Sequence, residues 1–548
     1  MEVIDLKNFE QLSPFEIKDE LIKLAKKASR TTQSAFLNAG RGNPNWIATT
    51  PREGYFLLGQ FAICESKRVM EHSVGLGGMP QMRGISDRLE VWLRLASHAE
   101  STGASFLSSM VKFAVKTFGF DPDAFVHELV DSIIGDNYPV PDRMLVHNER
   151  ITHEYLMWAM CGDPRPAGKF DLYAVEGGTA AMCYIFKSLK ANRLLHPGDT
   201  IALGTPIFTP YIEMTHLEDY ALNVVNIAAP QENRFQFTDS ELKKLEDPKI
   251  KAFFVVNPGN PTGVALSKET IGKIASLVKN KRPDLMLLTD DVYGTFVPEF
   301  RSLLGELPQN TIGVYSYSKY FGATGWRLGV IAVHEDNIYD KMIAKLPQAE
   351  LKALDKRYGP LTLEPRTIKF IDRIVADSRD VALNHTAGLS LPQQVMMTMF
   401  SLAELMDTEK RYQTACRDIV YRRVHALLEG LGLQLPPNPL YDAYYGLIDF
   451  EFFAKKNIGD EAVEYLKKNV HPLDLAFRLA EDHGIVLLNG GGFDAPDWSL
   501  RVSLANLPDE VYEEIGRGVR AIARGYRDAH NASKHVAETQ ESAATVGR

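Results

Sequence analysis

From about residue 170 onward, short apolar runs alternate with longer stretches whose apolar positions repeat every three to four residues. The longer stretches, such as residues 179–192 and 268–278, have the period of amphipathic helices. The short runs are typical of buried strands, and the expected strands cover residues 172–175, 200–203, 252–256, 286–289, 311–315 and 328–333. This alternation predicts an α/β fold, in which a mainly parallel sheet carries helices on both faces.

Other parts of the sequence predict further units around this large domain. Ser13, Pro14 and Glu16 have the order of an N-cap, a first-turn proline and a capping-box glutamate, so a helix should begin there. Near the C-terminus, helices mixed with strands at 485–488 and 500–504 indicate a smaller α+β domain. The predicted order is an N-terminal segment joining the small domain (1–50), a helical extension (51–140), the large domain (141–390) with a helical insertion near 335–380, the small domain (391–529), and a disordered tail (530–548).

Composition and charge narrow the functional class. The 548 residues suffice for two or more domains. The net charge of −9 argues against nucleic-acid binding, which usually requires an excess of basic residues. Four cysteines without paired spacing argue against a disulfide framework or a metal site. There is no secretory signal pattern and no apolar run near the roughly 20 residues of a membrane helix. We therefore expect a cytoplasmic protein.

A lysine follows one of the predicted strands. Ser316-Tyr-Ser-Lys319 ends the strand, and Arg327 lies eight residues beyond the lysine. Desolvation next to another cation lowers the pKa of a lysine, which turns its amine into a nucleophile that can form an imine. Taken alone, Lys319 is more often a solvated loop residue, and only the neighbouring motifs favour the chemical interpretation.

A carboxylate and two hydrogen-bonding side chains follow other strands. Asp290 could pair with a pyridinium nitrogen and keep it protonated, although an aspartate here could also be a helix cap. Tyr293 could donate to a phenolic oxygen of a cofactor, or it could be a core aromatic. Asn260 lies in Asn257-Pro-Gly-Asn-Pro-Thr-Gly263, where its amide could bind the same oxygen, or the run could be a tight turn.

Three further features suit an anionic, flat ligand. Gly177-Gly178-Thr179 follows a strand and opens a helix, so its backbone N–H groups could bind an anion. Phe208 could stack on a ring, with a core phenylalanine as the alternative. Arg501 offers a fork that matches a carboxylate, and its alternative role is a surface salt bridge.

The ordered set of these motifs, between residues 170 and 505, resembles the class I/II aminotransferase superfamily of fold-type I pyridoxal-phosphate enzymes. The resemblance implies that Lys319 is the Schiff-base lysine and that Arg501 binds the substrate α-carboxylate. It also implies at least a dimer, because Tyr138 matches a tyrosine that reaches the phosphate of the neighbouring subunit. The other implied contacts are Asp290 to the pyridinium nitrogen, Asn260 and Tyr293 to the phenolic oxygen, Phe208 to the ring, and Gly178, Thr179, Ser316 and Arg327 to the phosphate.

Within the superfamily, the sequence resembles the aspartate 4-decarboxylase family. The motifs that carry this resemblance, beside the unusual length, are residues 40–46, 77–83 and 385–394. It implies β-decarboxylation of L-aspartate to L-alanine and CO2, a side aspartate aminotransferase activity, and a large oligomer, with a dodecamer as the implied size. A tight clamp on the departing carboxylate would stabilise the ground state, so we expect a looser contact, from Arg41 with Thr386 and Tyr138 nearby. A surface loop arginine is the alternative for Arg41.

Two other functions remain open at this point. The nearest is an aminotransferase of another amino acid, or a related lyase, which would share the motif set. The other is a non-catalytic binding protein, which the complete set around Lys319 disfavours. A Rossmann dehydrogenase is excluded because no Gly-x-Gly-x-x-Gly follows the first strand.

Overall fold

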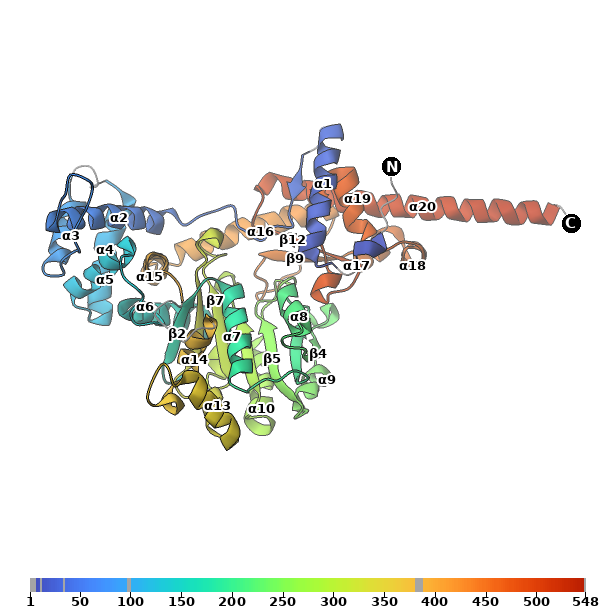
Figure 1. Ribbon diagram of the computed structural model, residues 1–548. Coiled ribbons are helices and arrows are strands. Elements are labelled where there is room, and N and C mark those ends of the chain that lie inside the picture. The colour runs from blue at the N-terminus through green and yellow to red at the C-terminus, as the bar shows by residue number, and fades with distance from the viewer. Residues whose placement is uncertain (1–5, 10–11, 33–34, 96–99, 380–387, 547–548) are drawn as a thin grey trace.

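The computed structural model describes residues 6–9, 12–32, 35–95, 100–379 and 388–546. Its centre is a seven-stranded sheet with the order β2-β8-β7-β6-β5-β3-β4 (Figure 1). Only β8 runs antiparallel to its neighbours in this sheet, so the predicted α/β fold with a mainly parallel sheet is confirmed. The strands are β2 (Phe170–Val175), β3 (Thr200–Thr205), β4 (Asn223–Ala228), β5 (Ile250–Val256), β6 (Met286–Asp290), β7 (Thr311–Ser316) and β8 (Gly329–His334).

The pleat of the strands explains why both faces of this sheet are apolar. Phe254 and Val256 of β5 face one side and pack with α7, whereas Phe253 and Val255 face the other and pack with α10. The edge strand β4 was missed by the sequence analysis because most of its residues are exposed or half-buried. Helices of this large unit are α6 (Val146–Leu156), α7 (Gly178–Ala191), α8 (Thr209–His216), α9 (Asp239–Lys243), α10 (Lys268–Lys281) and α11 (Leu303–Glu306).

The helical insertion consists of α12 (Ile338–Ala344), α13 (Gln348–Tyr358) and α14 (Phe370–Ser378). Apolar residues of α14, including Phe370 and Ile374, join the core that α7 forms on the sheet. The insertion therefore thickens one face of the large unit.

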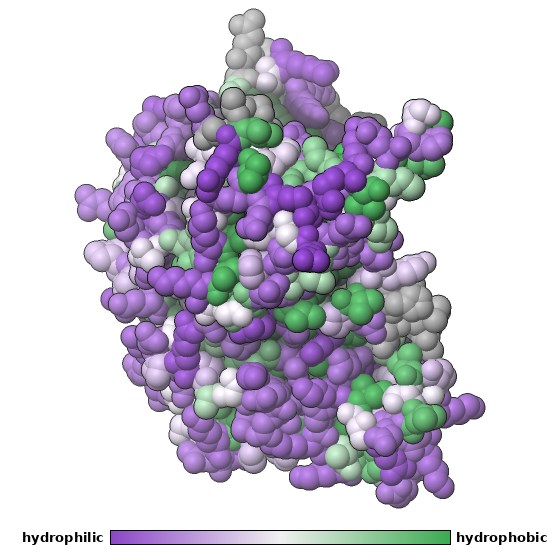
Figure 2. Space-filling view, turned by 90° about the vertical axis from the view of Figure 1, so that its left-hand side faces the viewer, coloured by the Kyte–Doolittle hydropathy of each residue, from purple (hydrophilic) through white to green (hydrophobic). Residues whose placement is uncertain are grey.

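The helical extension contains α2 (Thr49–Val69), α3 (Ile85–Leu93), α4 (Thr102–Phe118) and α5 (Pro122–Ile134). Ser101 and Asp121 cap α4 and α5 by accepting from backbone N–H groups, as helix starts require. α15 (Leu391–Met406) packs among these helices through Val395, Met399 and Leu402. Met396, Met397 and Phe400 of the same helix belong to the core that includes the C-terminal unit, so α15 contributes to both cores. Viewed from the side of the extension, the surface is mostly hydrophilic with scattered apolar groups (Figure 2).

The C-terminal unit has a three-stranded antiparallel sheet in the order β11-β12-β9. The N-terminal segment reaches this unit, since β1 pairs with β10 in parallel. The N-terminal segment and the C-terminal unit together contain α1 (Pro14–Thr32), β1 (Leu37–Asn38), α16 (Arg411–Leu431), β9 (Tyr445–Asp449), α17 (Phe450–Ile458), α18 (Asp460–Asn469), α19 (Asp474–His483), β10 (Ile485–Val486), β11 (Leu488–Asn489), β12 (Ser499–Ser503) and α20 (Tyr512–Val546).

The predicted disordered tail is instead the end of α20, which projects from the molecule (Figure 1). Residues 530–546 include four Ala and two Glu, which favour helix, and His530 and Lys534 near the start of this stretch contact Tyr465 and Glu461. Apolar periodicity reports a buried face, so its absence did not exclude a helix. Within the described residues, no helix combines the length and apolarity needed to span a membrane.

Candidate active site

A cavity of about 340 Å³ lies where the carboxyl ends of β2, β5, β6 and β7 meet the C-terminal unit. Parallel strands collect ligand-binding loops at this edge. The cavity brings together the predicted residues Gly178, Thr179, Phe208, Asn260, Asp290, Tyr293, Ser316, Lys319, Arg327 and Arg501. Residues from distant parts of the sequence therefore share one site.

Lys319 lies in the turn after β7, with its side chain half-buried. Its Nζ donates to the carbonyl oxygen of Gly42 at 3.1 Å. The next residue, Tyr320, is held firmly: its hydroxyl donates to Glu404 at 2.9 Å, and its carbonyl accepts from Trp46 Nε1 at 3.1 Å. The hydrogen bonds of Tyr320 therefore hold the backbone that carries the amine.

Asp290 is the last residue of β6 and is buried. Burial raises the pKa of Asp290 to about 6, although hydrogen bonds from the Val292 N–H and the Tyr211 hydroxyl and the charge of Lys319 act in the opposite direction. Tyr211 Oη donates to Asp290 Oδ2 at 3.2 Å. A cation facing this carboxylate would favour its ionised form, so the position suits a positively charged ring nitrogen.

The sequence analysis gave Tyr211 no role. It lies three residues after Phe208, so the two side chains fall within one turn of the segment that begins α8. That spacing was the available signal.

An anion-binding cradle forms where α7 begins. Gly177 has φ 92°, a backbone conformation that favours glycine, and a Cβ atom there would lie 2.5 Å from Nη2 of Arg327, so the guanidinium lies close to this turn. Arg327 Nη2 donates to the carbonyl oxygen of Glu176 at 3.3 Å. With Thr179 at the helix start and the hydroxyls of Ser316 and Ser318 in the same cavity, this geometry suits a phosphate group.

Arg501, in β12, is only 1% exposed, so its alternative role in a surface salt bridge is wrong. Its Nη1 donates to Asn260 Oδ1 at 3.2 Å and its Nη2 to the carbonyl oxygen of Gly40 at 2.9 Å. Its Nε is buried without a hydrogen-bond partner among the described residues. Because a buried cation is costly unless it is paired, this guanidinium suits a carboxylate ligand.

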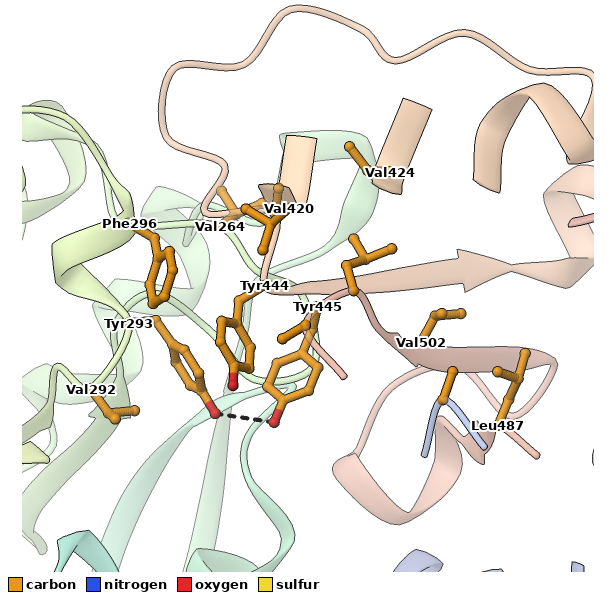
Figure 3. Close-up of a cluster of buried hydrophobic side chains, with 14 of the residues drawn as sticks. Val264, Val292, Tyr293, Phe296, Val420, Val424, Tyr444, Tyr445, Leu487 and Val502 are labelled. Atoms are coloured by element: carbon orange, nitrogen blue, oxygen red, sulfur yellow. Dashed lines mark hydrogen bonds between the residues drawn. The ribbon is translucent and has the colours of Figure 1, made fainter. Parts of the chain in front are cut away.

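Tyr445 lines the cavity and was missed by the sequence analysis. Tyr293 Oη donates to Tyr445 Oη at 3.3 Å, which joins the large unit to the C-terminal unit (Figure 3). The guanidinium of Arg501 lies 4.3 Å from the centre of the Tyr445 ring. The available signal was the aromatic pair Tyr444-Tyr445 ahead of a short apolar run, which is typical of a strand start.

Two predicted residues, Tyr138 and Arg41, do not line the cavity. Tyr138 is 67% exposed, and Arg41 is exposed beside Gly42, which does line it. Thr386 lies outside the described residues. The predicted contacts of these three residues stay predictions.

The sheet and the cavity define an aminotransferase-like protein of fold type I. Residues 177–518 match the family model "Aminotransferase class I and II", so the protein belongs to this family. Members of the family use pyridoxal phosphate, act on small-molecule substrates and commonly form dimers.

The sequence is 48% identical over 521 residues to the "Bifunctional aspartate aminotransferase and L-aspartate beta-decarboxylase" of Pseudomonas sp, and the match covers 95% of this protein and 97% of that one. Among solved structures, the fold matches an aspartate aminotransferase of Thermus thermophilus with a TM-score of 0.56 and 17% identity, covering 95% of this protein and 100% of that one. It also matches the aspartate aminotransferase of Rhizobium meliloti with a TM-score of 0.56 and 15% identity, covering 96% and 99%. At such identities the two structures show the fold.

Proposed function

We propose that this protein is a pyridoxal-phosphate-dependent L-aspartate β-decarboxylase with a side aspartate aminotransferase activity. The observation that carries the proposal is the 48% identity to the bifunctional Pseudomonas protein over 95% of the sequence. The family model begins at residue 177, so this similarity also extends over the helical extension, which a general aminotransferase would not need. The four free cysteines support a cytoplasmic location.

The residues in the cavity fit the cofactor. Lys319 would hold it covalently, Asp290 would pair with its ring nitrogen, and Asn260 and Tyr293 would bind its phenolic oxygen. When bound, pyridoxal phosphate withdraws electrons from the bonds around the substrate Cα. Phe208 would lie against its ring, and its phosphate would occupy the cradle of Gly178, Thr179, Ser316 and Arg327.

The buried guanidinium of Arg501 supports a carboxylate substrate. Its unpartnered Nε gives it donor capacity beyond the bonds to Asn260 and Gly40. We assign it the substrate α-carboxylate, which would place the substrate Cα near Lys319, the residue that would remove and return the Cα proton.

The β-carboxylate needs weaker contacts than the α-carboxylate if it is to leave as CO2. Arg41 is the proposed loose contact, with Thr386 and Tyr138 near the same end of the substrate. Tyr138 is also proposed to reach the phosphate of a neighbouring subunit, so the proposed assembly is a dimer with shared sites. A dodecamer built from six such dimers is the proposed larger form.

The test is a single assay of the purified protein with pyridoxal phosphate and L-aspartate, without added keto acid. We expect alanine and CO2 in equal amounts, and oxaloacetate with glutamate once 2-oxoglutarate is supplied. Formation of oxaloacetate without any alanine would instead identify an aminotransferase that lacks decarboxylase activity. A variant without the amine, Lys319→Ala, is the control for catalysis by free cofactor.

A further inference from the structure

The hydroxyl of Tyr445 occupies a central place in the cavity. Its side chain is 2% exposed, and the ring extends from β9 towards Tyr293 of the large unit (Figure 3). The Tyr293 hydroxyl donates to it at 3.3 Å, so the Tyr445 oxygen acts as an acceptor and its own proton points elsewhere.

The position of the hydroxyl follows from Gly42. A Cβ atom on this residue would lie 2.6 Å from Tyr445 Oη and 3.3 Å from Lys319 Nζ. The phenol and the amine therefore lie beside the same glycine. The guanidinium of Arg501 lies 4.3 Å from the Tyr445 ring centre. A substrate bound between Arg501 and Lys319 would therefore lie next to the Tyr445 hydroxyl.

The charges around Tyr445 favour release of its proton. Burial opposes ionisation, yet Lys319, Arg501 and the hydrogen bond from Tyr293 together lower the pKa of Tyr445 below its ordinary value, against a smaller opposing effect of Asp442. Burial raises the pKa of Tyr293 well above its ordinary value. Of the two phenols in the cavity, Tyr445 is the stronger acid.

The other acids that line the cavity in the described residues have different tasks under the proposed function. Asp290 faces the ring nitrogen, and Lys319 handles the Cα proton. Replacement of the β-carboxylate by hydrogen requires a further proton at Cβ, and a positioned acid is worth about 10²–10⁴-fold in rate.

We propose that Tyr445 is the catalytic acid that delivers the proton to Cβ in place of the departing carboxylate. The inference rests on the proposed decarboxylase function. The bond between Cα and Cβ stays intact, while the bond from Cβ to the β-carboxylate breaks and CO2 leaves. The electron pair of that bond ends in the new C–H bond, whose proton comes from Tyr445. The phenolate is stabilised by Lys319 and Arg501 and takes a proton from water when alanine departs.

The test compares Tyr445→Phe with the parent as holoenzymes. We expect alanine formation to fall about 100-fold or more, while transamination between aspartate and 2-oxoglutarate stays within about threefold, because it needs no proton at Cβ. Equal alanine formation by both proteins would overturn the inference. Parallel loss of both activities would also overturn it, since that result identifies a residue that only positions others.

A second readout needs neither cofactor nor turnover. Ultraviolet titration of tyrosinate in the ligand-free protein should show one tyrosine that ionises at unusually low pH. The step should vanish in Tyr445→Phe and persist in Tyr339→Phe, which removes a buried phenol bonded to the carbonyls of Leu287 and Asn310, away from the cavity. Persistence of the step in Tyr445→Phe would overturn the inference.

The outcomes separate this inference from the proposed function. A parent protein that makes no alanine contradicts the function, whereas alanine formation unaffected by Tyr445→Phe contradicts the inference alone. Should Tyr445→Phe fail to fold by circular dichroism, 3-fluorotyrosine at position 445 keeps the ring and lowers the phenol pKa. In a plot of the rate of alanine formation against pH, the fall in rate at alkaline pH should then begin at a lower pH. An unchanged position of this fall would overturn the inference.

Discussion

Lys319 Nζ donates to the carbonyl oxygen of Gly42 at 3.1 Å, although 277 positions separate the two residues. The same carbonyl accepts from the Tyr444 hydroxyl at 2.8 Å. The N-terminal segment thus forms one wall of the cavity and holds the lysine from that side. A covalent bond between Lys319 and the cofactor would replace its hydrogen bond to Gly42, so we expect cofactor binding to change the contacts of this segment.

Replacement of the amine should abolish turnover and leave the fold intact. In Lys319→Ala we expect the rate of alanine formation to fall at least about 10²–10⁴-fold, because both the attachment point and the Cα base are lost. Assays of alanine with thermal melting check this. The exposed Lys345→Ala, at the end of α12, is the matched control and should retain full activity. Appreciable turnover by Lys319→Ala would contradict the assignment.

Asp290→Asn should stabilise the ligand-free protein at neutral pH. Because burial raises the pKa of Asp290 from 3.8 to about 6, its contribution to stability is full below about pH 4 and is lost as the pH rises through 6. The neutral amide avoids this loss, so we expect a gain of about 2–3 kcal/mol in unfolding free energy at pH 7. The gain should disappear near pH 4 in denaturant titrations.

The neighbouring Asp291 is a matched control for Asp290. Burial raises its pKa to about 8, and it does not line the cavity. Asp291→Asn should retain cofactor binding, measured by visible absorbance, whereas Asp290→Asn should weaken it. Equal cofactor affinity in both variants would contradict the role of Asp290.

Arg501→Lys should weaken substrate binding more than it changes the cofactor. An ammonium cannot reproduce the two-pronged contact with a carboxylate, and loss of a buried charge-assisted contact costs about 2–5 kcal/mol. We therefore expect kcat/KM for aspartate to fall by about 30-fold or more, with unchanged absorbance of the bound cofactor. An unaltered kcat/KM would place the α-carboxylate elsewhere.

Tyr138 allows a test of shared sites between subunits. If it serves the neighbouring subunit, a mixed assembly of Tyr138→Phe and Lys319→Ala subunits contains sites with a native lysine and a native tyrosine. Each mixed dimer then has one native site of two, and about half of the dimers in a freely reassorted equal mixture are mixed. The mixture should therefore recover about one quarter of the parent activity. Mixing Tyr138→Phe with itself after the same treatment is the control, and the absence of any recovery would contradict the shared site.

The sequence predicted which residues meet in the cavity better than it predicted the elements around them. Strand ends carry Asp290 and Lys319 in local patterns that depend on apolar runs and turn residues alone, so they were readable without a structure. Tyr211 and Tyr445 were not readable as site residues, because an aromatic residue in an apolar context is equally suited to a core. Their roles depend on which distant side chains they meet.

The sequence does not show which distant elements an apolar helix packs against. α15 has the same apolar pattern whichever elements it packs on, and only the structure shows that Val395 joins the core of the helical extension whereas Phe400 joins the core that includes the C-terminal unit. The helical end of α20 was missed because the stretch lacks apolar periodicity, although its Ala and Glu residues favour helix.

By itself, the sequence determined the alternation of strands and helices, the family and ten of the residues that line the cavity, because these follow from local periodicity and from ordered motifs. The tertiary structure decided that Arg501 is buried and that its Nε has no hydrogen-bond partner among the described residues. It also decided that the Gly42 carbonyl accepts a hydrogen bond from Lys319, and that Tyr445 lies next to both Arg501 and Gly42. These relationships arise from packing between segments hundreds of residues apart, and burial and charge environment exist only once that packing has formed.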